Sequence, residues 1–144
     1  MSGVRARPIR RARPADAAAL FPLAVELATS FVPERAAFTR AFRDATARRD
    51  ACVLVAERDG RIVGYLLGFE HPAFFANGRV AWIEEVAVAA GLRRGGIGRA
   101  LVTAFERWAR SRRARLVALA TRRAGAFYRA LGYEESATYF RKVF

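Results

Sequence analysis

The chain has 144 residues, of which 53% are hydrophobic, and a formal net charge of +13. This length predicts one domain over residues 1–144, large enough to bury its own core. A single cysteine, Cys52, excludes an internal disulfide and a cysteine-based zinc cluster and favours a reducing, cytoplasmic compartment. With one histidine, His71, we expect no metal site.

Arginine supplies nearly all of the positive charge, because Lys142 is the only lysine among 26 basic residues. The arginines concentrate at residues 5–13 and 107–115. Such a surface attracts polyanions, so a basic nucleic-acid-binding or regulatory module is one interpretation. No apolar run reaches the ~18 residues of a membrane span, and we expect no membrane partner.

The first half of the chain alternates amphipathic and strand-like segments. Periodicity and turn signals predict a strand at residues 7–12, helices at 14–28 and 33–49, strands at 53–57 and 62–69, and a loop at 71–78. Pro14 is well placed to open the first helix. Asp59-Gly60 is typical of a tight hairpin turn.

The second half predicts a strand at 80–88, a helix at 98–112, a buried strand at 116–120, a short helix at 124–131, and one or two final strands at 134–143. Glu106 and Arg110 have the spacing of a helical ion pair, and Gly132 has the position of a helix stop. Hairpins come first and a strand–helix–strand order follows. The pattern therefore indicates an α/β domain with a mixed β-sheet covered by helices.

The segment from Val86 to Leu101 is the most informative part of the chain. An apolar strand ends in a loop rich in arginine and glycine, and an amphipathic helix follows at once. Glycine lets the backbone approach a ligand closely, and the first N–H groups of a helix attract an anion. The pattern predicts a phosphate-binding loop made of Arg93, Arg94, Gly95, Gly96, Ile97, Gly98 and Arg99. It is neither a Walker loop nor the dinucleotide fingerprint.

Residues 93–98 fit the pattern Gln/Arg-x-x-Gly-x-Gly/Ala, which resembles the pyrophosphate loop of the Gcn5-related N-acetyltransferase (GNAT) superfamily. Downstream, Phe127-Tyr128 followed by Gly132-Tyr133 resembles the Phe-Tyr-x-x-x-Gly-Phe/Tyr signature of the same superfamily. Residues 9–16 resemble its first strand and helix start. The resemblance covers nearly the whole chain. It implies the acyl-coenzyme A N-acyltransferase fold, a central mixed sheet flanked by about four helices.

The resemblance also implies an activity, the transfer of an acetyl group from acetyl-coenzyme A to a primary amine by direct attack on the thioester. In the family, pantetheine pairs with a strand edge, so Val86 and Val88 are the expected backbone partners. Alternation along a strand lets both face the same side, although both could also be core valines. Thr121 stands where many relatives carry an asparagine near the coenzyme, and a threonine cannot present an amide.

Three side chains are the candidate catalytic groups. Tyr128 matches the family tyrosine beside the coenzyme sulfur. Because a phenol has a pKa near 10 and a thiol near 8.5, a hydrogen bond to the departing thiolate is expected rather than full proton transfer. Glu84 and Glu85 precede the loop and are expected on opposite faces of the strand, so that one reaches the amine. The resemblance favours Glu84, but either glutamate could be an ordinary solvated or salt-bridged carboxylate.

The sequence does not identify the amine acceptor. A small amine, an amino acid, an aminoglycoside, a protein N-terminus and a lysine side chain all stay open. The positive surface argues mildly against a polycationic acceptor, unless Glu70, Glu84 and Glu85 make the pocket acidic. His71 could line that pocket or be an ordinary solvated residue. We expect no specific nucleic acid as partner, and a homodimer is an expectation because dimers are common in the superfamily.

Overall fold

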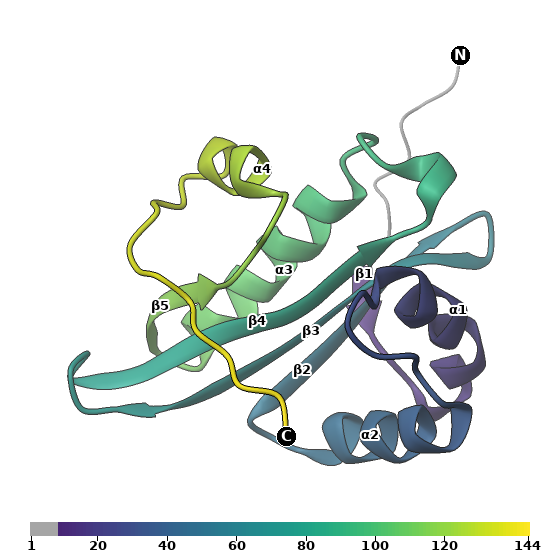
Figure 1. Ribbon diagram of the computed structural model, residues 1–144, viewed down its shortest axis with the longest axis horizontal. Coiled ribbons are helices and arrows are strands. Elements are labelled where there is room, and N and C mark those ends of the chain that lie inside the picture. The colour runs from purple at the N-terminus through teal and green to yellow at the C-terminus, as the bar shows by residue number, and fades with distance from the viewer. Residues whose placement is uncertain (1–8) are drawn as a thin grey trace.

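The computed structural model describes residues 9–144 and arranges them as a five-stranded sheet with helices on both faces (Figure 1). Residues 7 and 8 of the predicted first strand lie outside the described part. The elements in chain order are β1 (Ile9–Arg11), a 3-10 turn (Pro14–Asp16), α1 (Ala17–Leu27), α2 (Arg35–Ala47), β2 (Ala51–Arg58), β3 (Arg61–Ala73), β4 (Gly78–Val88), a second 3-10 turn (Ala90–Leu92), α3 (Ile97–Ser111), β5 (Ala114–Leu119) and α4 (Gly125–Ala130).

The sheet has the order β1-β2-β3-β4-β5 and is mixed, as predicted. The first four strands are antiparallel neighbours, whereas β5 is parallel to β4. Asp59 and Gly60 have φ angles of 52° and 75°, which a two-residue turn that fits the strand twist requires. α3 connects β4 to β5, and a crossover helix of this kind makes the two strands parallel.

α3 covers one face of the sheet, and α1 and α2 cover part of the other (Figure 1). On the α3 face, Phe105 is completely buried. A Cβ at Gly68 would lie 2.3 Å from Cε2 of Phe105, so glycine at this position lets the helix lie directly on β3. The other cluster packs Leu20, Leu23 and Phe42 against Tyr65 of β3.

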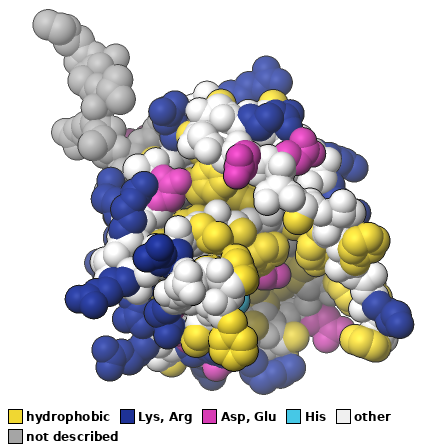
Figure 2. All heavy atoms as spheres, turned by 90° about the vertical axis from the view of Figure 1, so that its left-hand side faces the viewer, with side chains coloured by type: hydrophobic (Ala, Val, Ile, Leu, Met, Phe, Trp, Pro, Cys, Tyr) yellow, Lys and Arg dark blue, Asp and Glu magenta, His cyan; other side chains and the backbone are white. Residues whose placement is uncertain are grey.

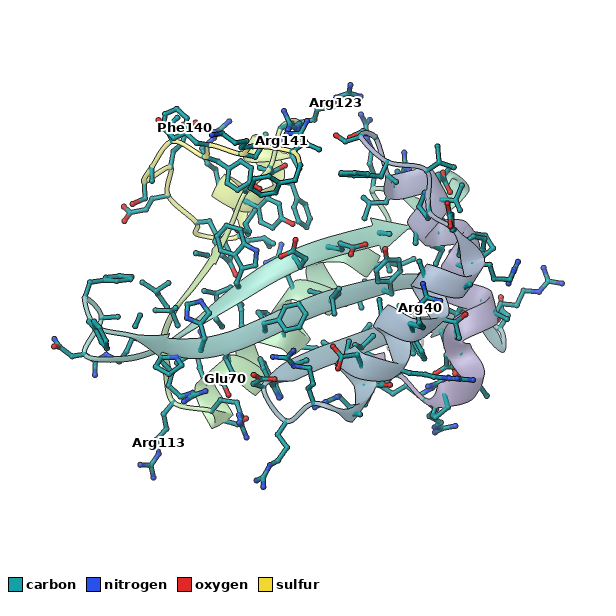
Figure 3. The ribbon with its side chains drawn as sticks, turned by 60° about the horizontal axis from the view of Figure 1, so that its bottom comes forward. Arg40, Glu70, Arg113, Arg123, Phe140 and Arg141 are labelled. Carbon is teal, nitrogen blue, oxygen red and sulfur yellow. The ribbon has the colours of Figure 1, made fainter. Side chains whose placement is uncertain are left out.

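Glu70 of β3 is a buried carboxylate at the end of the sheet distant from the predicted phosphate loop. It accepts hydrogen bonds from Arg79 of β4 and, at 2.8 Å, from Arg112 at the C-terminus of α3. Burial acts to raise the pKa of Glu70, but the two guanidiniums outweigh it and hold that pKa below its usual value. The cluster ties α3 to the hairpin of β3 and β4, so Glu70 is a structural group that does not line the predicted pocket (Figure 3).

Several sequence predictions need correction. The expected loop at 71–78 is shorter, because β3 runs to Ala73 and β4 begins at Gly78. The final strands predicted at 134–143 do not form, and residues 133–144 make a tail without helix or strand. β5 is consequently an edge strand, so the strand predicted as buried exposes 39% of Leu116. Glu106 accepts a hydrogen bond from Tyr133 at 2.8 Å instead of pairing with Arg110.

The C-terminal tail crosses the sheet on the side of α1 and α2 (Figure 1). Nη1 of Arg141 donates to Oγ of Ser30 at 2.9 Å, which joins the tail to the connection between α1 and α2. Within residues 9–144, no helix combines the length and the apolar character that crossing a bilayer would require.

Candidate active site

Among residues 9–144, no strand pairs with one edge of β4 over residues 84–88. β4 pairs with β3 as far as Val88, but it pairs with β5 only as far as Ile83. The N–H of Ala89 donates to the carbonyl of Val63 on β3 at 2.8 Å. Because backbone groups alternate in direction along an antiparallel pair, the N–H and C=O groups of Val86 and Val88 are directed away from β3, to the free edge.

A β-bulge begins at the point where β4 leaves β5. Leu67 of β3 lies opposite Glu85, and Gly68 lies opposite Ile83. Glu84 is therefore an extra residue without a partner on β3. A bulge bends its strand and increases the local twist, and this one lies next to Ile83, the last residue of β4 that pairs with β5.

The bulge also places Glu84 and Glu85 on the same face of the sheet. The hydroxyl of Tyr65, which packs against α1 and α2, donates to Glu85 at 2.7 Å. Nε1 of Trp82 donates to Glu84 at 2.9 Å. Trp82 lies opposite Phe69 on β3, and the ring of Phe69 is 5.9 Å from the guanidinium of Arg48 at the end of α2. Trp82 and Glu84 are therefore on the face that α1 and α2 cover, as Tyr65 and Glu85 are.

The expectation that Glu84 and Glu85 point to opposite faces is therefore wrong. Strict alternation holds only in a regular strand, and the extra residue breaks it. The two donors, Tyr65 and Trp82, were not singled out from the sequence. The spacing of two residues between Trp82 and Glu84 could have indicated that their side chains share one face of the strand. No such signal exists for Tyr65, because it lies on another strand.

The predicted phosphate loop follows β4 after the 3-10 turn at Ala90–Leu92 and ends in the first turn of α3. Gly96 is the N-cap, with φ of 84°, and in the described part of the chain no side chain caps the helix. The N–H groups of Ile97, Gly98 and Arg99 therefore have no partner within the helix. Arg94 and Arg99 are exposed beside them, and Gly95 lies between Arg94 and the cap.

Arg93 is already engaged. Its Nε donates to the carbonyl of Val88 at 3.3 Å, and its Nη2 pairs with Glu26 of α1 at 3.2 Å. This contact to Val88 is consistent with a carbonyl that is directed to the free edge of β4. Arg93 is thus partly neutralised, whereas Arg94 is the more available charge.

α4 lies against the start of α3 and the end of β4. A Cβ at Gly98 would be 3.4 Å from Cζ of Phe127 and 3.9 Å from Cγ2 of Val88. The ring of Tyr128 contacts Phe127 and Tyr133, with centroid distances of 4.9 Å and 5.6 Å. Burial raises the pKa of Tyr128 above its usual value. Among the described residues, its hydroxyl has no hydrogen-bond partner.

The remaining predicted residues have more ordinary surroundings. Oγ1 of Thr121 accepts a hydrogen bond from the N–H of Ala124 at 3.1 Å and so supports the start of α4. His71 is exposed on β3, with Nδ1 3.0 Å from the carbonyl of Pro72. A cavity of about 300 Å³ lies between the start of α1 and α2, away from the free edge of β4. Among residues 9–144, no group of three or more histidine, cysteine or acidic residues is arranged to hold a metal ion.

The sequence matches the model of the acetyltransferase (GNAT) family over residues 18–133. No curated protein sequence matches the chain significantly. Among solved structures, a transcriptional regulator from Bacillus halodurans C-125 is 25% identical, with a TM-score of 0.86 over 96% of this chain and 100% of the other.

Two further structures share the fold at lower identity. The glucosamine-6-phosphate N-acetyltransferase from Arabidopsis thaliana is 22% identical, with a TM-score of 0.85 over 97% of this chain and 99% of the other. An aminoglycoside 6'-N-acetyltransferase from Acinetobacter haemolyticus is 21% identical, with a TM-score of 0.78 over 95% and 99%. The predicted fold is confirmed by these similarities.

Proposed function

Because this chain belongs to the acetyltransferase (GNAT) family, we propose that it is an N-acetyltransferase that moves an acetyl group from acetyl-coenzyme A to a primary amine. One observation carries the proposal. Among the described residues, the edge of β4 at residues 84–88 has no paired strand, and the chain passes from it through a short 3-10 turn to the N-terminus of α3, which no described side chain caps. An extended amide-containing arm that ends in a pyrophosphate fits these two features together.

The chain offers separate groups for the two parts of the coenzyme. The backbone of Val86 and Val88 can pair with amides in the pantetheine arm, as an added strand would. The N–H groups of Ile97, Gly98 and Arg99 can bind the pyrophosphate, and Arg94 adds a cation. Gly95 and Gly96 let the backbone approach it closely. The Thr121 hydroxyl accepts a hydrogen bond from Ala124, so its own O–H can still donate to the coenzyme.

The candidate catalytic groups lie on both sides of that edge. Glu84, or Glu85 beside it, accepts a proton from the incoming ammonium, directly or through water. A backbone N–H at the free edge stabilises the oxyanion as nitrogen attacks the thioester carbon. Tyr128 donates a hydrogen bond to the sulfur as the C–S bond breaks. Its raised pKa keeps the phenol protonated at neutral pH, which suits a donor better than an acid that gives up its proton.

Calorimetric titration of the full chain with acetyl-coenzyme A tests the coenzyme site, and release of free thiol with an amine present tests the transfer. We expect saturable binding at one site and thiol release that depends on the amine. A folded chain that does not bind acetyl-coenzyme A would contradict the proposal. Binding without thiol release for any amine would retain the coenzyme site and refute the transfer.

A regulatory, nucleic-acid-binding function is the second candidate. Exposed arginines such as Arg107, Arg113 and Arg115, together with the similarity to a transcriptional regulator, support it. Thermal stabilisation by acetyl-coenzyme A and by a DNA duplex, compared at ~150 mM salt where weak polyanion binding is screened, separates the two. The cytoplasmic location, the homodimer and the absence of a specific nucleic-acid partner stay predictions.

A further inference from the structure

The sheet face that carries Glu84 and Glu85 is apolar on the side of β5. Trp82 is partly exposed there, and Ala118 of β5 lies next to it. Val117 and Leu119 of β5 pack against the α3 cluster. Because side chains alternate along a strand, Ala118 and the exposed Leu116 lie on the opposite face, with Trp82. The carboxylates therefore border an apolar surface.

Two segments on this side of the sheet carry exposed apolar side chains. The tail and the connection between α1 and α2 lie on the same side of the sheet (Figures 1 and 3), and Arg141 and Ser30 join them. Phe31 and Val32 follow Ser30 and are 68% and 87% exposed, and Tyr139 in the tail is 60% exposed. Figure 2, which views the molecule from the left-hand side of Figure 1, shows hydrophobic side chains gathered at the end of the sheet, with a hollow beside an acidic side chain.

The charges around Glu84 and Glu85 favour an amine with one positive charge over a polycationic amine. Glu84 and Glu85 each accept a hydrogen bond from a neutral donor, Trp82 and Tyr65 respectively. Within residues 9–144, neither carboxylate pairs with an arginine, so both keep their attraction for an ammonium group. The chain has a net charge of +13, and basic side chains outnumber acidic ones on the face shown in Figure 2. A polycation would place its further charges against that basic rim, where like charges repel.

We propose that the acceptor is a monoamine on an apolar body, preferably an aromatic one, and that Trp82 determines this specificity by contacting the body while Glu84 receives the ammonium. This inference rests on the proposed function. The reaction is the same: the ammonium gives one proton to Glu84, its nitrogen bonds to the thioester carbon, and the C–S bond breaks. Coenzyme A leaves as a thiolate and takes up, through solvent, the second proton that the nitrogen loses. Trp82 orients Glu84 through its N–H and gives the substrate an apolar surface.

The test measures kcat and KM of the full chain with four amines: 2-phenylethylamine, n-propylamine, kanamycin and glucosamine 6-phosphate. We expect 2-phenylethylamine to have the highest kcat/KM, on the order of tenfold or more above the two polar amines, as ring burial allows. Trp82→Ala should raise the KM for 2-phenylethylamine on the order of tenfold. It should change the KM for n-propylamine much less, because that amine has no ring to lose contact. The kcat should fall for both amines, because the hydrogen bond from Trp82 to Glu84 is lost.

Matched variants separate specificity from folding. Trp82→Phe keeps an aromatic surface and should retain most of the preference for 2-phenylethylamine. Phe74→Ala removes another aromatic ring, which is fully exposed at the tip of the β3–β4 hairpin. This variant should leave kcat and KM for all four amines unchanged. The comparison of amines with the wild-type chain does not depend on any variant folding.

Three results would overturn the inference. One is a higher kcat/KM for kanamycin or glucosamine 6-phosphate than for 2-phenylethylamine. Another is an equal effect of Trp82→Ala on the KM for 2-phenylethylamine and the KM for n-propylamine. The third is no turnover of 2-phenylethylamine by a chain that binds acetyl-coenzyme A in calorimetry. None of these three results would contradict the proposed coenzyme site, because each concerns only the acceptor amine. Loss of acetyl-coenzyme A binding itself would instead refute the proposed function.

Discussion

Arg93 reaches back to the strand that precedes it, and its Nε donates to the carbonyl oxygen of Val88 at 3.3 Å. The same guanidinium pairs with Glu26 of α1. A coenzyme arm that pairs with Val88 would compete with Arg93 for this carbonyl. Arg93 therefore differs from Arg94, which is exposed in the loop.

This difference predicts unequal effects of the two arginines on coenzyme binding. Arg94→Ala should weaken acetyl-coenzyme A about 3- to 30-fold at low salt, as the loss of an exposed charge-assisted contact does, and should flatten the dependence of affinity on salt. Arg93→Ala should have a smaller effect, because its charge is already partly neutralised. Calorimetry at several salt concentrations measures both. Equal slopes for the wild type and Arg94→Ala would argue against a phosphate contact.

Gly96 and Gly98 should respond differently to a side chain. Gly96 has φ of 84°, which a β-branched residue adopts only with strain, so Gly96→Val should abolish measurable acetyl-coenzyme A binding. A Cβ at Gly98 would meet Phe127 at 3.4 Å, an ordinary contact, so Gly98→Ala should bind within a few-fold of wild type. Circular dichroism confirms folding. If folded Gly96→Val binds as wild type does, the loop is not the phosphate site.

Tyr128→Phe tests the hydrogen bond to the leaving sulfur. The variant keeps the ring contacts with Phe127 and Tyr133. An interaction made only in the transition state lowers kcat without changing ground-state binding. We expect acetyl-coenzyme A affinity within twofold of wild type and kcat lower by roughly 10- to 1000-fold. An unchanged kcat, with chemistry rate-limiting, would assign Tyr128 to packing alone.

Glu84→Gln and Glu85→Gln separate the two carboxylates. Glu84 is the more exposed of the two, and we expect its loss to lower kcat/KM by about 10²-fold near pH 7, the usual effect of a lost general base. The defect should shrink toward pH 10, because the amine is then already neutral. Glu85→Gln can still accept the Tyr65 hydrogen bond and should be milder. A pH–rate profile measures both, and the reverse ranking would assign the base to Glu85.

Glu70→Gln tests the structural cluster. The folded-state pKa of Glu70 is lowered, so the ionised carboxylate stabilises the fold above its unfolded pKa near 4.5, and this contribution is lost as the pH falls through the folded value. The variant should lower the free energy of unfolding by roughly 1–3 kcal/mol at pH 7. The difference from wild type should diminish below about pH 4.5. Urea unfolding at pH 7 and pH 3 provides the measurement, and a difference that does not depend on pH would contradict the charge assignment.

Local chemistry was enough to predict most elements and the main motifs. Asp59-Gly60 requires a turn whatever surrounds it, because few other residue pairs tolerate two left-handed φ angles. The loop before α3 was also readable, since arginine, glycine and an amphipathic helix follow one another in the chain. The apolar stripes of α1 and α3 had the period of a helix and became buried faces.

Tertiary structure alone decided the features that depend on neighbouring strands. The bulge at Glu84 arises from the register of β3 against β4, and neither strand encodes that register by itself. It placed Glu84 and Glu85 on one face, next to the last residue of β4 that pairs with β5. The tail at 133–144 had a strand-like composition, but a strand forms only where a partner satisfies its backbone groups, so β5 stayed at the edge of the sheet.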